Sequence, residues 1–162
     1  MRLEFVDVDT LHEVAEMADR VWHEYFPCIL TEQQIDYMVD RFQSERAMKE
    51  QVLEKGYRYA FIVNDDVRVG YTAISISGDK LFISKLYLLS ENRGKGYGRG
   101  ALDMVCEIGR ENGLKTVYLT VNKHNDRAIR TYLANGFKTI QSIVTDIGEG
   151  FVMDDFVMEK VL

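Results

Sequence analysis

Residues 91–100 read ENRGKGYGRG, with four glycines and three cations in ten positions. The stretch follows the β-prone run KLFISKLYLL (residues 80–89) and precedes an apolar segment with helical spacing. A strand that enters a glycine-rich loop and then a helix commonly binds phosphate, because the first amides of a helix have no intrahelical acceptor. Glycines also permit positive φ, so successive amides can point at one anion. The stretch therefore predicts a pyrophosphate cradle.

Two other phosphate-binding loops compete with this interpretation. A nucleoside-triphosphate loop needs Ser or Thr after its lysine, whereas Gly96 follows Lys95 here. The spacing of Gly96, Gly98 and Ala101 satisfies G-x-G-x-x-A, but a dinucleotide site also needs an acid after the next strand. That place is occupied by TVNKHN (residues 120–125), which has no acid.

The charge balance separates the remaining interpretations of the stretch. A flexible surface loop and an Arg-Gly contact to nucleic acid both remain open from the loop sequence alone. The formal net charge of the chain is −6, whereas nonspecific nucleic-acid binders are usually basic. Arg93, Lys95 and Arg99 are thus a local exception on an acidic chain. This favours a small anionic ligand, and we expect no nucleic-acid partner.

Runs rich in β-branched and aromatic residues lie on both sides of the glycine-rich stretch. Upstream, turn residues separate three such runs at the intervals of an antiparallel meander. Downstream, helical spacing ends at Gly113 and at Gly136, which indicates two helices alternating with strands. The predicted strands are residues 59–64, 67–77, 80–89, 116–121, 138–146 and 151–160, and the predicted helices end at Gly113 and span residues 127–135 after a cap at Asn125 or Asp126.

Two helical segments precede the meander. The first covers residues 9–24, with Asp9 or Thr10 as its cap. The second begins at Thr31, which forms a capping box with Gln34, and runs with a break to about residue 53. We therefore predict an α/β fold with a mixed, mainly antiparallel sheet flanked by helices. The expected order is α-α-β-β-β-α-β-α-β-β, with room for a further strand near the N-terminus.

The bulk composition predicts one domain over residues 1–162. Hydrophobic residues make up 46% of the chain, there is a single proline, and we find no linker or internal repeat. No segment has the apolar run of a signal peptide or a membrane span. Cys28 and Cys106 lack metal-ligand spacing, and we expect both to be buried structural thiols. We therefore expect a reduced, cytoplasmic protein with no metal site and no membrane partner.

The glycine-rich stretch and a second motif together resemble the GNAT superfamily of N-acetyltransferases. The first family signature, Gln/Arg-x-x-Gly-x-Gly/Ala between the fourth strand and the next helix, matches residues 93–98. The second signature is Asn-x-x-Ala-x-x-x-Tyr-x-x-x-Gly-Phe after the following strand. Its matching residues are Asn125, Ala128, Tyr132, Gly136 and Phe137. The resemblance runs from about Tyr59 to the C-terminus and implies a GNAT-like fold with acetyl-CoA as cosubstrate.

The resemblance also implies roles for individual residues. Asn125 would contact the pantetheine arm or cap the following helix, and the two roles are compatible. Tyr132 would protonate the departing thiolate; without the motif it would be taken for a half-buried aromatic on the apolar helix face. The implied cofactor contacts are the backbone of Leu86, Tyr87 and Leu88 for the pantetheine arm and Arg93, Gly94, Lys95, Gly96, Tyr97, Gly98 and Arg99 for the pyrophosphate.

The acceptor side is less defined by sequence. The family often places its acceptor wall where WHEYF (residues 22–26) lies, so Trp22, Glu24 and Tyr25 are candidates there, together with Asp154 near the C-terminus. Glu24, Tyr25 and Asp154 are also the candidates for the general base, with an ordered-water relay as the alternative. We expect His23 to be an exposed helix residue. Lys85 departs from relatives that carry an acidic base on this strand.

These observations predict an acetyl-CoA-dependent N-acetyltransferase that acts on a primary amine by direct attack in a ternary complex. Within the family the chain most resembles the polyamine and small-amine acetyltransferases, so we expect a small-molecule amine as acceptor. The alternatives are a catalytically silent acyl-CoA-binding or sensor domain and a protein or peptide N-acetyltransferase. The sequence is compatible with a homodimer.

Overall fold

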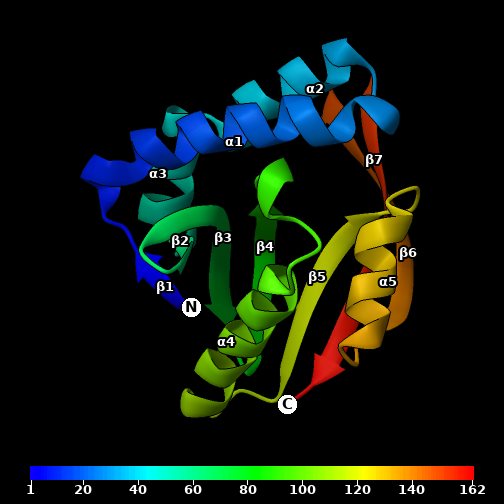
Figure 1. Ribbon diagram of the computed structural model, residues 1–162. Helices are drawn as coiled ribbons and strands as arrows, with labels where there is room; N and C mark the ends of the chain where they lie inside the picture. The colour runs from blue at the N-terminus through cyan, green and yellow to red at the C-terminus, as the bar shows by residue number, and fades with distance from the viewer.

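The computed structural model describes residues 1–162 and contains one seven-stranded sheet with helices on both faces (Figure 1). The strand order is β1-β2-β3-β4-β5-β7-β6, and every neighbouring pair is antiparallel except β4 and β5. The strands are β1 (Arg2–Phe5), β2 (Arg58–Asn64), β3 (Val67–Ser77), β4 (Lys80–Leu88), β5 (Thr116–Asn122), β6 (Lys138–Gly148) and β7 (Phe151–Val161). The predicted fold class is confirmed, and β1 is the further strand near the N-terminus.

The helices fall into two groups along the chain. Those before the meander are α1 (Leu11–Tyr25), α2 (Glu32–Met38) and α3 (Glu45–Lys55), and those after it are α4 (Tyr97–Glu111) and α5 (Asp126–Ala134). The predicted break in the second helical segment is real. A π-helical stretch, Val39–Gln43, is followed by Ser44 in an extended conformation, and the Ser44 side chain then caps α3.

The caps match the predictions at two helices and differ at the first. Thr31 accepts a hydrogen bond from the Gln34 amide, and Asn125 accepts one from the Ala128 amide. The capping box at Thr31 is only half formed, because the Gln34 side chain donates to the Val152 carbonyl instead of to the Thr31 amide. At α1, however, the Thr10 side chain caps nothing. A short 3-10 turn precedes α1, and the Asp7 carboxylate accepts the Asp9 amide at the start of that turn. The first turn thus begins earlier than helical periodicity indicated.

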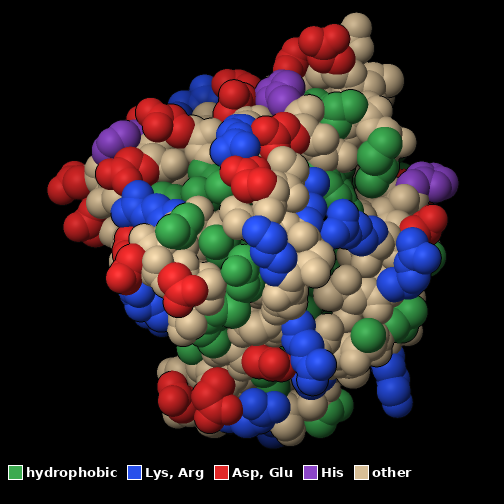
Figure 2. All heavy atoms as spheres, in the orientation of Figure 1, with side chains coloured by type: hydrophobic (Ala, Val, Ile, Leu, Met, Phe, Trp, Pro, Cys, Tyr) green, Lys and Arg blue, Asp and Glu red, His purple; other side chains and the backbone are tan.

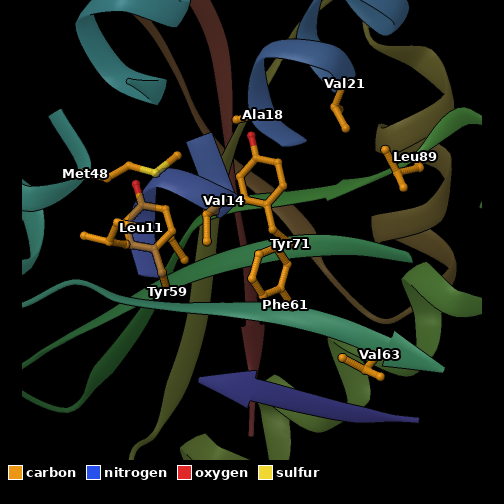
Figure 3. Packing of buried hydrophobic residues seen from close by; sticks show 11 residues of the cluster. Leu11, Val14, Ala18, Val21, Met48, Tyr59, Phe61, Val63, Tyr71 and Leu89 are labelled. Carbon is orange, nitrogen blue, oxygen red and sulfur yellow. The ribbon is translucent and has the colours of Figure 1, made fainter. Parts of the chain in front are cut away.

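Two apolar layers hold the sheet between its helices. On one face, α1 and α3 pack on β2 and β3 through large side chains that include Leu11, Met48, Tyr59, Phe61 and Tyr71 (Figure 3). On the other face, α4 and α5 cover a cluster formed by β4, β5 and β7. The alternation of side chains along each strand supplies both layers at once.

The two cysteines differ in burial. Cys106 lies in α4 within the second apolar layer, as predicted. The prediction for Cys28 is wrong, because its thiol is exposed and donates a hydrogen bond to the Tyr25 carbonyl. Pro27 lies in a short 3-10 turn, Phe26–Cys28, that follows α1, and this turn carries Cys28 out of the core. None of the helices combines the length and apolar character that crossing a bilayer requires.

The parallel pair at the centre of the sheet is only half formed. β4 and β5 are paired from Lys80–Ile83 opposite Thr116–Leu119, and no pairing continues beyond Ile83. The strands diverge toward α1, as Figure 1 shows. A bulge in β4 at Ser84, between the pairs that Ile83 and Lys85 make with β3, marks where the divergence begins. The far halves of β4 and β5 therefore form the two walls of an opening through the sheet.

Candidate active site

A cleft of about 660 Å³ passes through the opening between β4 and β5. It extends from the glycine-rich loop at the start of α4, past the diverging strands, to a pocket under α1, α2 and α3. Its charged lining consists of five cations and one acid: Lys55, Lys85, Arg93, Arg99, Arg127 and Asp155. Figure 2 shows Lys and Arg side chains around the middle of the molecular face in view, with acidic side chains gathered over α1. The cleft is thus basic although the chain is acidic.

The glycine-rich loop presents unused backbone donors at the end of the cleft. No protein acceptor receives the amides of residues 94–99, and the first backbone bond of α4 runs from Gly100 to Gly96. Gly94 and Gly96 have φ of 75° and 83°, a conformation that other residues adopt only with strain. A helix terminus with this many free amides fits a phosphate or pyrophosphate.

The side chains of the loop divide between the cleft and its surroundings. Arg93 and Arg99 line the cleft, whereas Lys95 and Tyr97 do not. The Tyr97 hydroxyl accepts a hydrogen bond from Asn64 at the end of β2. Of the predicted cofactor contacts in this loop, Lys95 and Tyr97 are thus the two whose side chains lie outside the cleft.

Arg93 links the loop to the acceptor end of the cleft. Its guanidinium donates two hydrogen bonds to the Leu88 carbonyl, 3.0 and 3.2 Å long, and lies 4.6 Å from the Tyr25 ring centre. The Tyr25 hydroxyl in turn donates to the Asn125 side chain. Asn125 thus caps α5 and ties it to α1. The Leu88 carbonyl, predicted to bind the pantetheine arm, already has a partner within the chain.

Four functional groups meet near the middle of the cleft. Tyr87 from β4, Tyr132 from α5, Tyr25 from α1 and Asp155 from β7 all line it. Burial raises the pKa of the Tyr87 phenol, and the nearby Tyr132, Asp155 and Tyr25 raise it further. Burial likewise raises the pKa of Tyr132, so its phenol keeps its proton at neutral pH. We call these four residues the central cluster.

Comparison with known sequences identifies the family. A sequence profile described as the acetyltransferase (GNAT) family matches residues 15–137. The chain belongs to this family. It is therefore an N-acetyltransferase by descent, and both predicted signatures fall in or at the edge of the matched region.

The relatives of this GNAT chain extend over most of its length. It is 25% identical to a spermidine N(1)-acetyltransferase from Thermoplasma acidophilum, over 98% of this chain and 94% of that protein. An uncharacterized N-acetyltransferase from Mycobacterium tuberculosis is 31% identical over 78% of this chain and 81% of its own. The fold matches a PaiA N-acetyltransferase from T. acidophilum, crystallised with coenzyme A, with a TM-score of 0.80, 22% identity and complete coverage of both chains.

The GNAT chain brings only some of the predicted acceptor residues into the cleft. Trp22 lines it, packed against Phe26 and Tyr87 at centroid distances of 4.2 and 5.6 Å, and Tyr25 lines it as well. Glu24 does not, because it lies on the outer side of α1 in an ion pair with Arg20 at 2.9 Å. The sequence run WHEYF is helical, so its members point in different directions.

Asp154 is also outside the cleft, and its neighbour Asp155 is inside. Asp154 lies 2.6 Å from the Lys123 ammonium, close enough for an ion pair although not aligned as a hydrogen bond. Successive side chains on a strand point to opposite faces, so only one of two adjacent aspartates can enter the cleft. From the sequence, Asp154 and Asp155 are both acids near the expected acceptor side, and the face that β7 presents to the cleft selects Asp155.

Lys85 is a functional group that sequence reasoning set aside. Its side chain is only 4% exposed and lines the cleft, where its ammonium donates to Gln51 at 2.7 Å and to the Tyr59 hydroxyl. No carboxylate pairs with it. Burial, with a smaller contribution from Lys55, lowers the pKa of Lys85 to about 7. The lysine is therefore largely neutral just above neutral pH.

Replacing Lys85 by methionine should stabilise this acetyltransferase at pH 6.5, by on the order of 3 kcal/mol in the free energy of unfolding. Between pH 7 and 10.5 the unfolded lysine binds more protons than the native one, so wild-type stability should rise with pH and the advantage of the variant should shrink. Tyr59 still donates to Gln51 without the lysine. Urea denaturation at pH 6.5, 8 and 9.5 measures this, and a stability difference between variant and wild type that is the same at every pH would contradict it.

Proposed function

We propose that this acetyltransferase moves the acetyl group of acetyl-CoA to a primary amine of a small molecule, by direct attack in a ternary complex, with residues 1–162 acting as one domain. The observation that carries the proposal is the single cleft that joins the free amides of the glycine-rich loop to a pocket under α1 and α2. Two substrates entering from opposite ends would meet at the central cluster. Because both substrates are held side by side, the attack of the amine on the thioester becomes effectively unimolecular.

The donor end of the cleft suits coenzyme A. The free amides of residues 94–99 and the guanidinium of Arg99 would hold the pyrophosphate, and Arg127 at the start of α5 adds a further cation. The unpaired edge of β4 at Leu86 and Tyr87 would hydrogen-bond the pantetheine arm in the opening. These assignments are supported by the motif match and by the geometry of the cleft.

Tyr132 is the proposed proton donor to the departing thiolate. The side chain lines the cleft between the diverging strands, and its raised pKa keeps the donor protonated. Its ring also packs 5.8 Å from Phe137, so the residue has a structural contact as well. The thioester oxygen would accept from a backbone amide on the free edge of β4, which is the form of stabilisation that acyl transfer requires.

The proposed acceptor class is a polyamine or another small amine. The support for a polyamine is the similarity to a spermidine N(1)-acetyltransferase at 25% identity. Asp155 is the one carboxylate in the cleft and supplies a partner for one ammonium group. Acidic side chains over α1 would attract a cation toward the opening (Figure 2).

A thiol-release assay with acetyl-CoA tests the acceptor class. Spermidine, spermine, a neutral-ended monoamine, an aminoglycoside and a peptide with a free N-terminus form the panel. We expect kcat/KM to be highest for the polyamines and to fall as added salt screens the attraction. Transfer to the peptide alone, at a rate indifferent to salt, would exclude a polyamine and leave the enzyme class standing. Cofactor binding without transfer to any amine would favour the alternative, a silent acyl-CoA sensor.

A further inference from the structure

Asp155 is a buried carboxylate that the rest of the chain leaves without a partner. The side chain is 7% exposed, lines the cleft, and forms neither a hydrogen bond nor an ion pair within the protein. The two other acids considered for the acceptor side, Glu24 and Asp154, are both paired with cations. Burying an ionised group without a partner is costly, so such a group in a cleft indicates a partner supplied by the ligand.

Asp155 lies on β7 beside the opening between β4 and β5. It pairs in register with Asn122, in the part of β5 that has separated from β4. It is close enough to the Tyr87 hydroxyl, on the opposite wall of the opening, to raise the pKa of that phenol. Tyr132 on α5 also raises the pKa of the Tyr87 phenol, so the carboxylate and the proposed proton donor are both close to Tyr87.

We propose that Asp155 is the general base of the transfer, taking a proton from the ammonium group of the acceptor. This inference rests on the proposed function, because it presupposes an amine acceptor. The carboxylate first binds the ammonium and then accepts one of its protons, which it later releases to solvent. The free nitrogen bonds to the thioester carbon, the carbon–sulfur bond breaks, and the thiolate takes a proton from Tyr132. The second proton lost by the nitrogen restores Tyr132 through solvent.

The surroundings of Asp155 suit this role near neutral pH. Burial raises the pKa of the Asp155 carboxyl to about 6; Asp154 on β7 adds to the rise and Lys123, which follows β5, opposes it. Tyr87 on β4 is close enough to Asp155 for the two groups to interact, and Tyr132 on α5 and Tyr25 on α1 line the same cleft near Tyr87. A base must be ionised to accept a proton, so activity should fall as pH drops below about 6. General bases act best when their pKa is close to the working pH.

The test compares Asp155→Asn with Asp154→Asn, which changes the neighbouring residue outside the cleft. At pH 7 we expect Asp155→Asn to lower kcat by about 10²-fold with the best amine found for the wild type, and Asp154→Asn to lower it by less than about 3-fold. The Asp155→Asn rate should recover as pH rises toward the pKa of the free amine, whereas the wild-type rate stays level above pH 7. Asp155→Glu, which retains the carboxylate, should keep much of the activity.

The outcomes separate this inference from the proposed function. A wild type that binds acetyl-CoA but acetylates no amine would overturn both. An active wild type whose Asp155→Asn variant shows a higher KM, an unchanged kcat and the same pH profile would overturn the base assignment alone and make Asp155 a binding residue. A second measurement needs no variant and records the pH–rate profile of the wild type with acceptor amines of pKa about 8 and about 10. With both amines, the fall in rate on the acidic side should stay near pH 6. A fall whose midpoint moves with the pKa of the amine would also overturn the assignment.

Discussion

Replacing Gly98 by aspartate should weaken the binding of acetyl-CoA by about 10³-fold, because it places a negative charge beside the pyrophosphate site. At about 4 Å and an effective dielectric constant of 20, two like unit charges repel by about 4 kcal/mol, which corresponds to that factor. Gly98 is the second residue of α4 and lines the cleft. Its φ is not positive, and an added Cβ would lie 3.7 Å from Leu88, an ordinary contact. The backbone therefore tolerates the change.

Gly98→Ala is the matched control for this prediction, since it adds the Cβ without the charge and should alter affinity only slightly. An acid in the first turn also suits the helix dipole, so the aspartate variant should melt at or above the wild-type temperature. Titration calorimetry with acetyl-CoA and thermal melting measure the two effects. A loss of affinity below about 5-fold with an intact fold would show that the pyrophosphate lies elsewhere. Gly96 suits the test less well, because its φ of 83° adds strain to any substitution.

Replacing Tyr132 by phenylalanine should lower kcat by about 10²- to 10³-fold while the affinity for acetyl-CoA stays nearly constant. The change removes only the proton donor, because the ring contact with Phe137 survives. The loss should shrink as pH rises, since the thiol of coenzyme A is weakly acidic and a thiolate is a tolerable leaving group above its pKa.

The control for Tyr132 is Tyr118→Phe, which removes a phenolic hydroxyl from β5 outside the cleft while keeping the stack on Phe82. Steady-state kinetics over pH 6.5–9.5 and thermal melting separate the roles. If Tyr132→Phe lowered the melting temperature by several degrees and left the kinetics unchanged, Tyr132 would be a core residue. The proton would then come from solvent or from another member of the central cluster.

Most of the fold could be predicted from local sequence. β-branched runs, turn residues and helical spacing each express a short-range preference, so the order of strands and helices, the caps at Thr31 and Asn125 and the stop at Gly113 all follow from nearby residues. Helical periodicity failed at two short 3-10 turns beside α1. Asp7 takes over the cap expected at Thr10, and the turn that contains Pro27 leaves Cys28 exposed.

In the candidate site, too, one part could be predicted from nearby residues and the other part could not. The glycine-rich loop could be proposed as a phosphate cradle from ENRGKGYGRG alone, because such a cradle is built from consecutive backbone amides, which need only the right residues in the right order. The other end of the cleft is assembled from α1, α2, α3, β4 and β7, which are distant in the sequence. Which of Asp154 and Asp155 enters the cleft depends on the face that β7 presents after pairing with β5 and β6.

The sequence by itself determined the order of elements, the glycine-rich loop before α4 and the family, since each rests on residues that are close together along the chain. Only the tertiary structure decided that β4 and β5 part after Ile83, that Asp155 is left unpaired and that Lys85 is buried beside Gln51 and Tyr59. The physical reason is that burial and pairing of a charged side chain depend on contacts between separate elements. Solvent exposure sets its pKa, and no local pattern of residues specifies that exposure.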